Sequence, residues 1–193
     1  MHLACLFRIN NLILENKLTR LFVAFPIPAD ITAEYSAYIT RFKEISGLRW
    51  TKARNLHLTL FFIGEVEDRN IVHVINELKA FRNTLKSFTL VFEKITFRGK
   101  AHNPGMIWAQ FEKCEAFSEV SSQLFSIVSK YMTIVPRHLD PIPHITLARL
   151  KKGSELNLIK TDEFPMPKEM LVDKMELWKT VHTPDGVLYE KLA

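Results

Sequence analysis

Cysteine is scarce in this chain, and its scarcity excludes several kinds of protein. Only Cys5 and Cys114 occur, and neither stands in a C-x-x-C pair. Such a sequence has no disulfide framework and no structural zinc site, so a reducing, cytoplasmic setting is expected. No apolar stretch approaches the roughly 20 residues of a membrane span, so no membrane partner is expected.

Glycine is also scarce, with six residues in 193, and none of them builds a glycine-rich phosphate loop. The chain contains no H-E-x-x-H sequence, no carboxylate cluster and no Cys/His ligand spacing, so we expect neither a metal nor a cofactor. No low-complexity linker divides it, which favours one compact bilobal domain. Residues 1–18 lack the ordered regions of a signal peptide and are interpreted as an N-terminal extension before a domain over 19–193.

Basic side chains outnumber acidic ones. The 26 lysines and arginines against 21 aspartates and glutamates give a formal net charge of +5 at pH 7. A basic balance favours anionic partners such as nucleotides or RNA, although a mildly basic protein with a neutral partner is an equally open interpretation.

Two short stretches resemble each other. They are Leu-His-Leu-Thr-Leu at 56–60 and Pro-His-Ile-Thr-Leu at 143–147. Each reads His-x-Thr within an apolar run of strand length, and strand side chains alternate between faces. We therefore predict that His57 and Thr59 point the same way from one strand, and that His144 and Thr146 do so from another. A lone strand histidine is more often structural, so it is the recurrence that indicates a site.

The order of the predicted elements repeats as well. A strand, a helix and a His-x-Thr strand are predicted at 20–25, 31–45 and 56–64, and again at 106–111, 117–131 and 143–153. This repetition predicts two α+β lobes related by a pseudo-two-fold axis, each giving one central strand to a shared cleft. The remaining segments predict a helix at 71–78, strands at 88–97, 171–179 and 187–192, and a loop at 98–105.

Two histidines that face one cleft can divide the roles of general acid and general base near neutral pH. That division suits the attack of water on a phosphodiester: one imidazole takes the proton of water and the other protonates the leaving oxygen. Thr59 and Thr146 would donate hydrogen bonds to the phosphoryl oxygens. The chemistry needs no metal, and the pattern does not tell which of His57 and His144 is the acid.

Two further residues lie close to the motifs. Phe61 shares the outward face of His57 under strict alternation and could stack on a base, although packing in the core is an equally open interpretation. Arg149 stands five residues after His144, so strict alternation places it on the opposite face unless the strand twists or ends there.

These residues resemble the two-histidine phosphoesterase superfamily, and above all its RNA 2',3'-cyclic phosphodiesterases, historically called 2'-5' RNA ligases. Beyond the two motifs, the similar segments are Arg20 to Ala24, Leu48 to Val66, and the closing hairpin with Gly186 and Tyr189. The resemblance covers about residue 19 to the C-terminus. Thr180 departs from it, because the family commonly has serine there.

The resemblance implies a bilobal α+β fold, with antiparallel sheets flanking a central cleft, and metal-independent hydrolysis of a terminal 2',3'-cyclic phosphate to a 2'-phosphate. The proton donor of the family falls on His57 and its proton acceptor on His144. Thr59, Thr146 and Arg149 would bind phosphate. The implied partners are RNA ends or cyclic nucleotides, with no protein partner, and a monomer is expected.

Two alternatives stay open at this point. The same site could act on 2'-5' linked oligonucleotides or join RNA halves through a 2'-5' bond. A non-catalytic nucleotide- or RNA-binding module is the alternative from another class, although a pure binder needs no pair of titrating groups.

Overall fold

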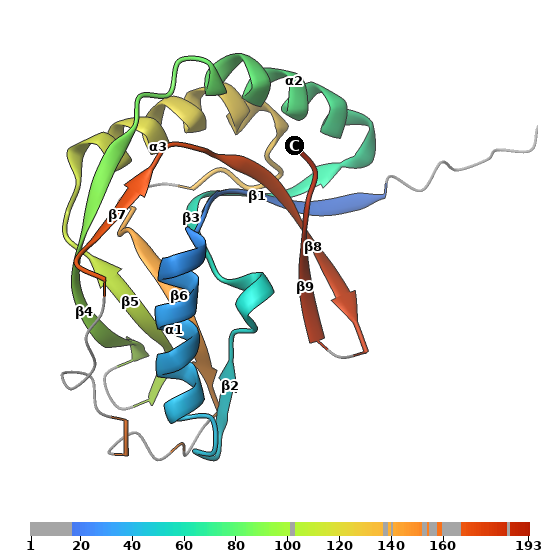
Figure 1. The fold of residues 1–193 in the computed structure, drawn as a ribbon. Helices are drawn as coiled ribbons and strands as arrows, with labels where there is room; N and C mark the ends of the chain where they lie inside the picture. The colour runs from blue at the N-terminus through green and yellow to red at the C-terminus, as the bar shows by residue number, and fades with distance from the viewer. Residues whose placement is uncertain are drawn as a thin grey trace, which may run out of the picture.

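The computed structural model describes residues 17–100, 103–136, 139, 141–151, 154, 158–159, 167–184 and 186–193 (Figure 1). The extension predicted at 1–18 therefore lies almost wholly outside the described residues. The strands are β1 (Leu18–Pro26), β2 (Leu48–Trp50), β3 (His57–Glu67), β4 (Phe88–Lys100), β5 (Asn103–Phe111), β6 (His144–Leu150), β7 (Glu169–Val172), β8 (Glu176–Thr183) and β9 (Gly186–Lys191). The α-helices are α1 (Ala29–Arg41), α2 (Ile71–Arg82) and α3 (Glu115–Val128).

The described strands form one curled antiparallel sheet in the order β7-β4-β5-β6-β3-β1-β8-β9, and β2 pairs with β6 beside this path. This order is symmetric about the boundary between β6 and β3: β6 and β5 on one side correspond to β3 and β1 on the other. The sequence of strand, helix and His-x-Thr strand occurs twice, as β1-α1-β3 and as β5-α3-β6. The predicted α+β class is confirmed, and the two predicted sheets are the halves of a single sheet.

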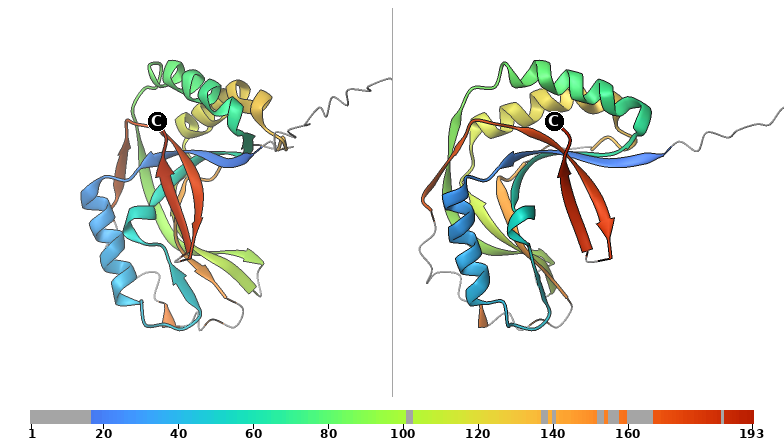
Figure 2. Two further views of the ribbon diagram at one scale, coloured as in Figure 1. Left: turned by 90° about the vertical axis from the view of Figure 1, so that its right-hand side faces the viewer. Right: turned by 45° about the vertical axis from the view of Figure 1, so that its right-hand side comes forward.

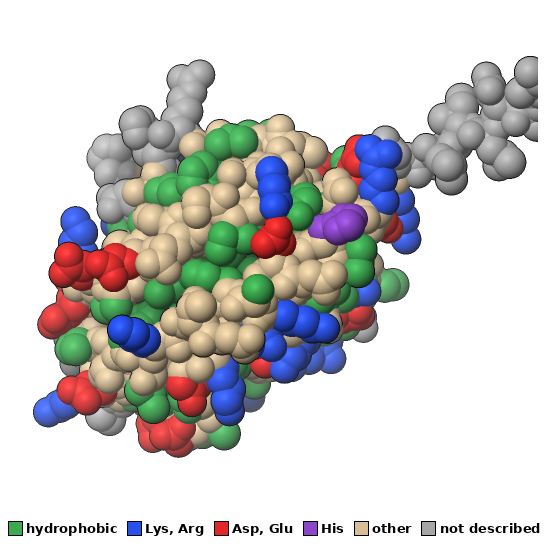
Figure 3. Space-filling view, turned by 90° about the horizontal axis from the view of Figure 1, so that it is seen from above, with side chains coloured by type: hydrophobic (Ala, Val, Ile, Leu, Met, Phe, Trp, Pro, Cys, Tyr) green, Lys and Arg blue, Asp and Glu red, His purple; other side chains and the backbone are tan. Residues whose placement is uncertain are grey.

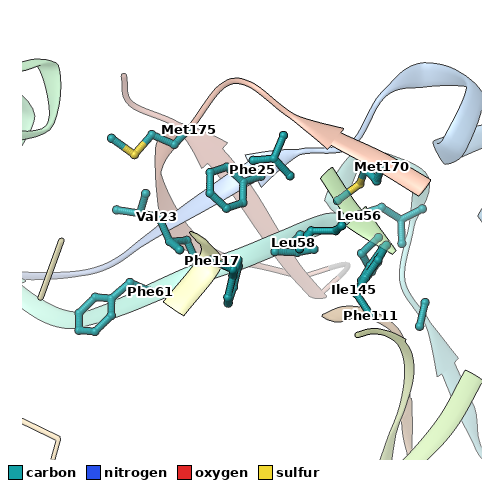
Figure 4. Close-up of a cluster of buried hydrophobic side chains, with 14 of the residues drawn as sticks. Val23, Phe25, Leu56, Leu58, Phe61, Phe111, Phe117, Ile145, Met170 and Met175 are labelled. Atoms are coloured by element: carbon teal, nitrogen blue, oxygen red, sulfur yellow. The ribbon is translucent and has the colours of Figure 1, made fainter. Parts of the chain in front are cut away.

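The two halves of the sheet meet between β3 and β6, where the ladder contains one residue pair, Leu58 opposite Ile145. This junction is here called the seam. Both side chains are fully buried and lie near each other in the core (Figure 4). Beyond this pair, Thr51 occupies the edge of β6: its amide donates to the Leu147 carbonyl and its hydroxyl to the Thr146 carbonyl, both at 2.8 Å.

The helices cover the outer surface of the curled sheet. Figures 1 and 2 show α2 and α3 side by side over β1 and β3, and α1 in front of the half that contains β5 and β6. Helix α1 follows Pro28 and buries Ile31, Tyr35 and Tyr38, which lie on one face at helical spacing. Seen from above, the outer surface mixes basic, acidic and apolar side chains (Figure 3), and an ion pair joins Lys130 to Glu77 there.

The sequence mislocated three elements. The loop predicted at 98–105 is mostly strand, because β4 continues to Lys100 and β5 already begins at Asn103. The strand predicted at 171–179 is two strands, β7 and β8, which pair with β4 and β1 in opposite halves of the sheet. The short strand β2 was missed, because its three residues are held by the partner β6 rather than by their own pattern.

None of the helices within the described ranges is long and apolar enough to cross a membrane.

Leu58→Ala is expected to lower the free energy of unfolding by about 2–5 kcal/mol, because it leaves a cavity at the seam where no neighbouring ladder pair compensates. Urea unfolding followed by circular dichroism measures this loss. The matched control is Leu171→Ala on β7, where the side chain is 56% exposed and the change is expected to stay within about 0.5 kcal/mol. Equal losses in the two variants would contradict the importance of the seam.

Candidate active site

The seam brings the two His-x-Thr motifs together. Because Leu58 lies opposite Ile145 in an antiparallel register, His57 faces toward Thr146 and Thr59 toward His144 across the two strands. All four side chains are half-buried and lie on the face of the sheet opposite to the buried pair. The predicted meeting of the two motifs on one surface is therefore what the register produces.

A β-bulge follows the first motif and overturns one prediction. Val23 pairs with Phe61 and Ala24 pairs with Thr59, so Leu60 is an extra residue in β3. The bulge buries two consecutive side chains and shifts the alternation by one residue. Phe61 is only 6% exposed and packs in the core, with its ring 5.9 Å from that of Phe125 (Figure 4). The prediction that Phe61 faces the site is wrong.

Phe62 takes the place that was predicted for Phe61. It is 61% exposed, and its ring lies 5.8 Å from that of Phe22, which in turn lies 5.0 Å from the imidazole of His57. Strict alternation did not place Phe62 on this face. The signal that could have identified it is an apolar pair, Leu60 and Phe61, directly after the threonine.

The second motif has the same bulge at the equivalent position. Ile107 pairs with Ala148 and Trp108 pairs with Thr146, so Leu147 is the extra residue in β6. Leu147 and Ala148 are both buried, and Arg149 returns to the face of His144. The expectation from strict alternation, that Arg149 lies on the opposite face, is therefore wrong. Its guanidinium is exposed and donates a weak hydrogen bond to Met106 Sδ at 3.7 Å.

The same local contact orients both imidazoles. Nδ1 of His57 lies 2.7 Å from the carbonyl oxygen of Asn55, and Nδ1 of His144 lies 2.7 Å from that of Ile142. A carbonyl oxygen only accepts hydrogen bonds, so each Nδ1 carries a proton and donates it. The second nitrogen, Nε2, is thereby left as the proton-exchanging atom of each ring.

The buried side chain of Asn55 ties the first histidine to the last strand. Its Nδ2 donates to the Val187 carbonyl at 2.8 Å, and its Oδ1 accepts the Tyr189 amide at 3.4 Å. Asn55 had no role predicted from the sequence, because its amide binds backbone 132 residues or more away in the chain.

The imidazole of His57 lies among aromatic rings. Its centroid is 5.0 Å from that of Phe22, 5.7 Å from Trp178 and 4.9 Å from Tyr189. Burial lowers the pKa of His57 to about 4, although the hydrogen bond to the Asn55 carbonyl raises this pKa. Positive charge on His144 or Arg149 also lowers the pKa of His57, which places both groups within its electrostatic reach.

The imidazole of His144 stacks on an indole. Its centroid is 3.5 Å from that of Trp108 with an angle of 16° between the planes, and the Arg98 guanidinium lies 4.9 Å from the Trp108 centroid. Burial lowers the pKa of His144, and the positive charge of Arg98 lowers it further. This contact depends on the pairing of β5 with β6, so no local pattern in the sequence indicates it.

Within the described ranges, no three side chains of His, Cys, Asp or Glu come together in a group that could hold a metal ion. The guanidiniums of Arg149 and Arg98 are close enough to lower the pKa values of His57 and His144 respectively. The arrangement can therefore bind an anion and exchange protons with it at two points.

Comparisons with known proteins find similar sequences. The model of the family described as LigT like phosphoesterase matches residues 25–108, which contain the first motif. The RNA 2',3'-cyclic phosphodiesterase of Thermotoga maritima is 26% identical over 176 residues, covering 90% of this chain and 92% of that protein.

Solved structures show the same fold. A Thermus thermophilus protein superposes with a TM-score of 0.74 at 24% identity, covering 90% of this chain and 95% of its own. Escherichia coli LigT, in complex with 3'-AMP, superposes with a TM-score of 0.72 at 21% identity, covering 92% and 97%. With paired His-x-Thr strands across one seam and these relatives, the chain is similar to the LigT like phosphoesterases.

Proposed function

We propose that this protein is an RNA 2',3'-cyclic phosphodiesterase that hydrolyses a terminal 2',3'-cyclic phosphate to a 2'-phosphate without a metal ion. The observation that carries the proposal is the pair of imidazoles with Nδ1 fixed by a backbone carbonyl and Nε2 left to exchange protons. The curated relative from Thermotoga maritima carries the same activity in its name, which supports the choice of substrate. We further propose a monomer in the cytoplasm.

In the proposed mechanism, the cyclic phosphate binds between the two imidazoles. Nε2 of neutral His144 accepts a proton from water as the water oxygen forms a bond to phosphorus. The bond between phosphorus and the 3'-oxygen breaks, and Nε2–H of protonated His57 gives its proton to the departing oxygen. Atoms and protons balance, and the product has a 2'-phosphate and a 3'-hydroxyl.

The threonines and Arg149 would stabilise the charge that develops on the non-bridging oxygens. Thr59 and Thr146 each present a hydroxyl two residues from a catalytic histidine on the same face. Arg149 supplies a delocalised positive charge with several donors, which suits a phosphoryl group. Arg98 favours the neutral form of His144, as a general base requires.

The low pKa of His57 is compatible with its role as a proton donor only when substrate is bound. In the free protein burial favours the neutral ring. A phosphate anion between the imidazoles favours the imidazolium form, because opposite charges attract across a partly dehydrated site. The substrate would thus generate the acid that its own hydrolysis needs.

Replacing either histidine by alanine is expected to lower hydrolysis by at least about 100-fold, because each variant lacks one proton-transfer group. The measurement is turnover of a nucleoside 2',3'-cyclic monophosphate, and of a short RNA with a cyclic-phosphate end, with EDTA present. The product isomer is identified by phosphorus NMR. His73→Ala on the exposed side of α2 is the matched control and should keep wild-type activity.

Each other outcome of this experiment has a defined meaning. A 3'-phosphate product would reverse the leaving group and exchange the roles of His57 and His144. Wild-type rates in both histidine variants would exclude the two-histidine mechanism. No turnover by the wild-type protein would favour 2'-5' linked oligonucleotides as substrates, or a module that only binds.

The free protein is expected to show His57 titrating near pH 4, well below the ordinary imidazole pKa of 6.5. Inorganic phosphate should raise the pKa of His57, because the bound anion stabilises the positive ring. Proton NMR titration of the ring signals, assigned with His57→Gln, measures both values. Sodium chloride at equal ionic strength is the control. A His57 that titrates at 6.5 without phosphate would refute the influence of burial.

Phe62→Ala is expected to raise KM for cyclic nucleotides by about 5- to 100-fold with a smaller change in kcat, because it removes a stacking surface for the base. Steady-state kinetics with 2',3'-cyclic AMP test this. Phe62→Tyr keeps an aromatic face and should stay near the wild-type KM. If Phe62→Ala keeps the wild-type KM, the base does not bind there.

A further inference from the structure

A notch opens between β1 and β8. The two strands pair only from Leu21 to Ala24, opposite Lys179 to Glu176, and they diverge beyond that point (Figure 2). The space between them has a volume of about 570 Å³. Its lining is here called the notch and comprises Lys17, Leu18, Thr19, Arg20, Glu65, Lys179, Thr180, Val181 and His182.

Both edges of the notch carry main-chain groups without a strand partner on that side. Among the described residues, Thr19 and Arg20 pair with β3 alone, and Thr180 and His182 pair with β9 alone. Main-chain amides at such an edge are available as hydrogen-bond donors. The notch therefore offers directional polar contacts in addition to charge.

The charge of the notch is positive. Its lining contains Lys17, Arg20 and Lys179 against one carboxylate, that of Glu65. Lys179 contacts Glu190 at 2.9 Å, whereas Lys17 and Arg20 have no ion pair within the described part of the chain. Two cations without an ion pair among the described residues, at the rim of a cavity, suit an anionic ligand.

The notch follows the surroundings of His57 along both strands. Arg20 precedes Phe22 by two residues on β1, and Thr180 follows Trp178 by two residues on β8. The rings of Phe22 and Trp178 both contact His57. Two residues along a strand return to the same face and advance by about 7 Å. A ligand extending from His57 by about one nucleotide would therefore reach the notch.

We propose that the notch binds the phosphodiester groups of RNA that lie upstream of the terminal nucleotide. The inference rests on the proposed function and extends it: the notch makes a polynucleotide end a better substrate than a free cyclic nucleotide. Arg20 and Lys17 neutralise phosphates of the RNA backbone. The charge of this backbone does not depend on the base sequence, so the preference is for RNA chains in general.

The test compares two substrates in one variant. Lys17→Ala/Arg20→Ala is expected to lower kcat/KM about tenfold for a short RNA ending in a 2',3'-cyclic phosphate, mainly through KM. For 2',3'-cyclic AMP, which has no upstream phosphate, kcat/KM should stay within about twofold. The dependence of log KM on log salt for the RNA should become shallower by about 1.4, because two phosphate contacts on a single strand are lost.

The matched control removes two exposed lysines outside the notch, in Lys86→Ala/Lys174→Ala, and should leave both substrates unaffected. Equal losses on both substrates in the notch variant, or an RNA loss of the same size in the control, would overturn the inference. If the wild-type protein hydrolyses neither substrate, the proposed function itself fails. If the wild-type protein hydrolyses both substrates and the notch variant keeps the wild-type preference for RNA, the proposed role of the notch is refuted and the proposed function stands.

Discussion

The site depends on one residue pair, Leu58 opposite Ile145, which joins the two halves of the sheet. Burial of these two side chains holds β3 against β6, and the antiparallel register then fixes which polar groups face each other on the other side. A slip by one residue would turn both histidines into the core. The packing of the seam and the geometry of the site are therefore one constraint.

The two matching bulges add a second layer to this arrangement. In both halves two consecutive side chains are buried directly after the threonine, Leu60 with Phe61 and Leu147 with Ala148. The next residue is exposed in each half, but its chemistry differs: Phe62 in one and Arg149 in the other. A duplicated backbone thus presents an aromatic face on one side and a cation on the other. Under the proposed function, these would contact base and phosphate.

The environments of the two histidines also differ although their backbone contacts agree. His57 is enclosed by the rings of Phe22, Trp178 and Tyr189, whereas His144 stacks on Trp108 with Arg98 beyond it. Both pKa values are lowered, mainly by burial, but the further charges come from different arginines. Equal geometry with unequal electrostatics is what a division between acid and base requires. The notch beside His57 adds a further difference between the halves.

The sequence by itself determined the α+β class and the repeated order of elements. It also determined that His57 shares a face of its strand with Thr59, and that His144 does so with Thr146. Period-two alternation is a local property, so it can be read from neighbouring residues. Tertiary structure decided the rest. The bulges moved Phe61 into the core and brought Phe62 and Arg149 to the surface, because an extra residue is defined only against a partner strand. Trp108 and Trp178 joined the site, and the Asn55 side chain found its partners, through strands distant in sequence, and such contacts leave no local pattern in the chain.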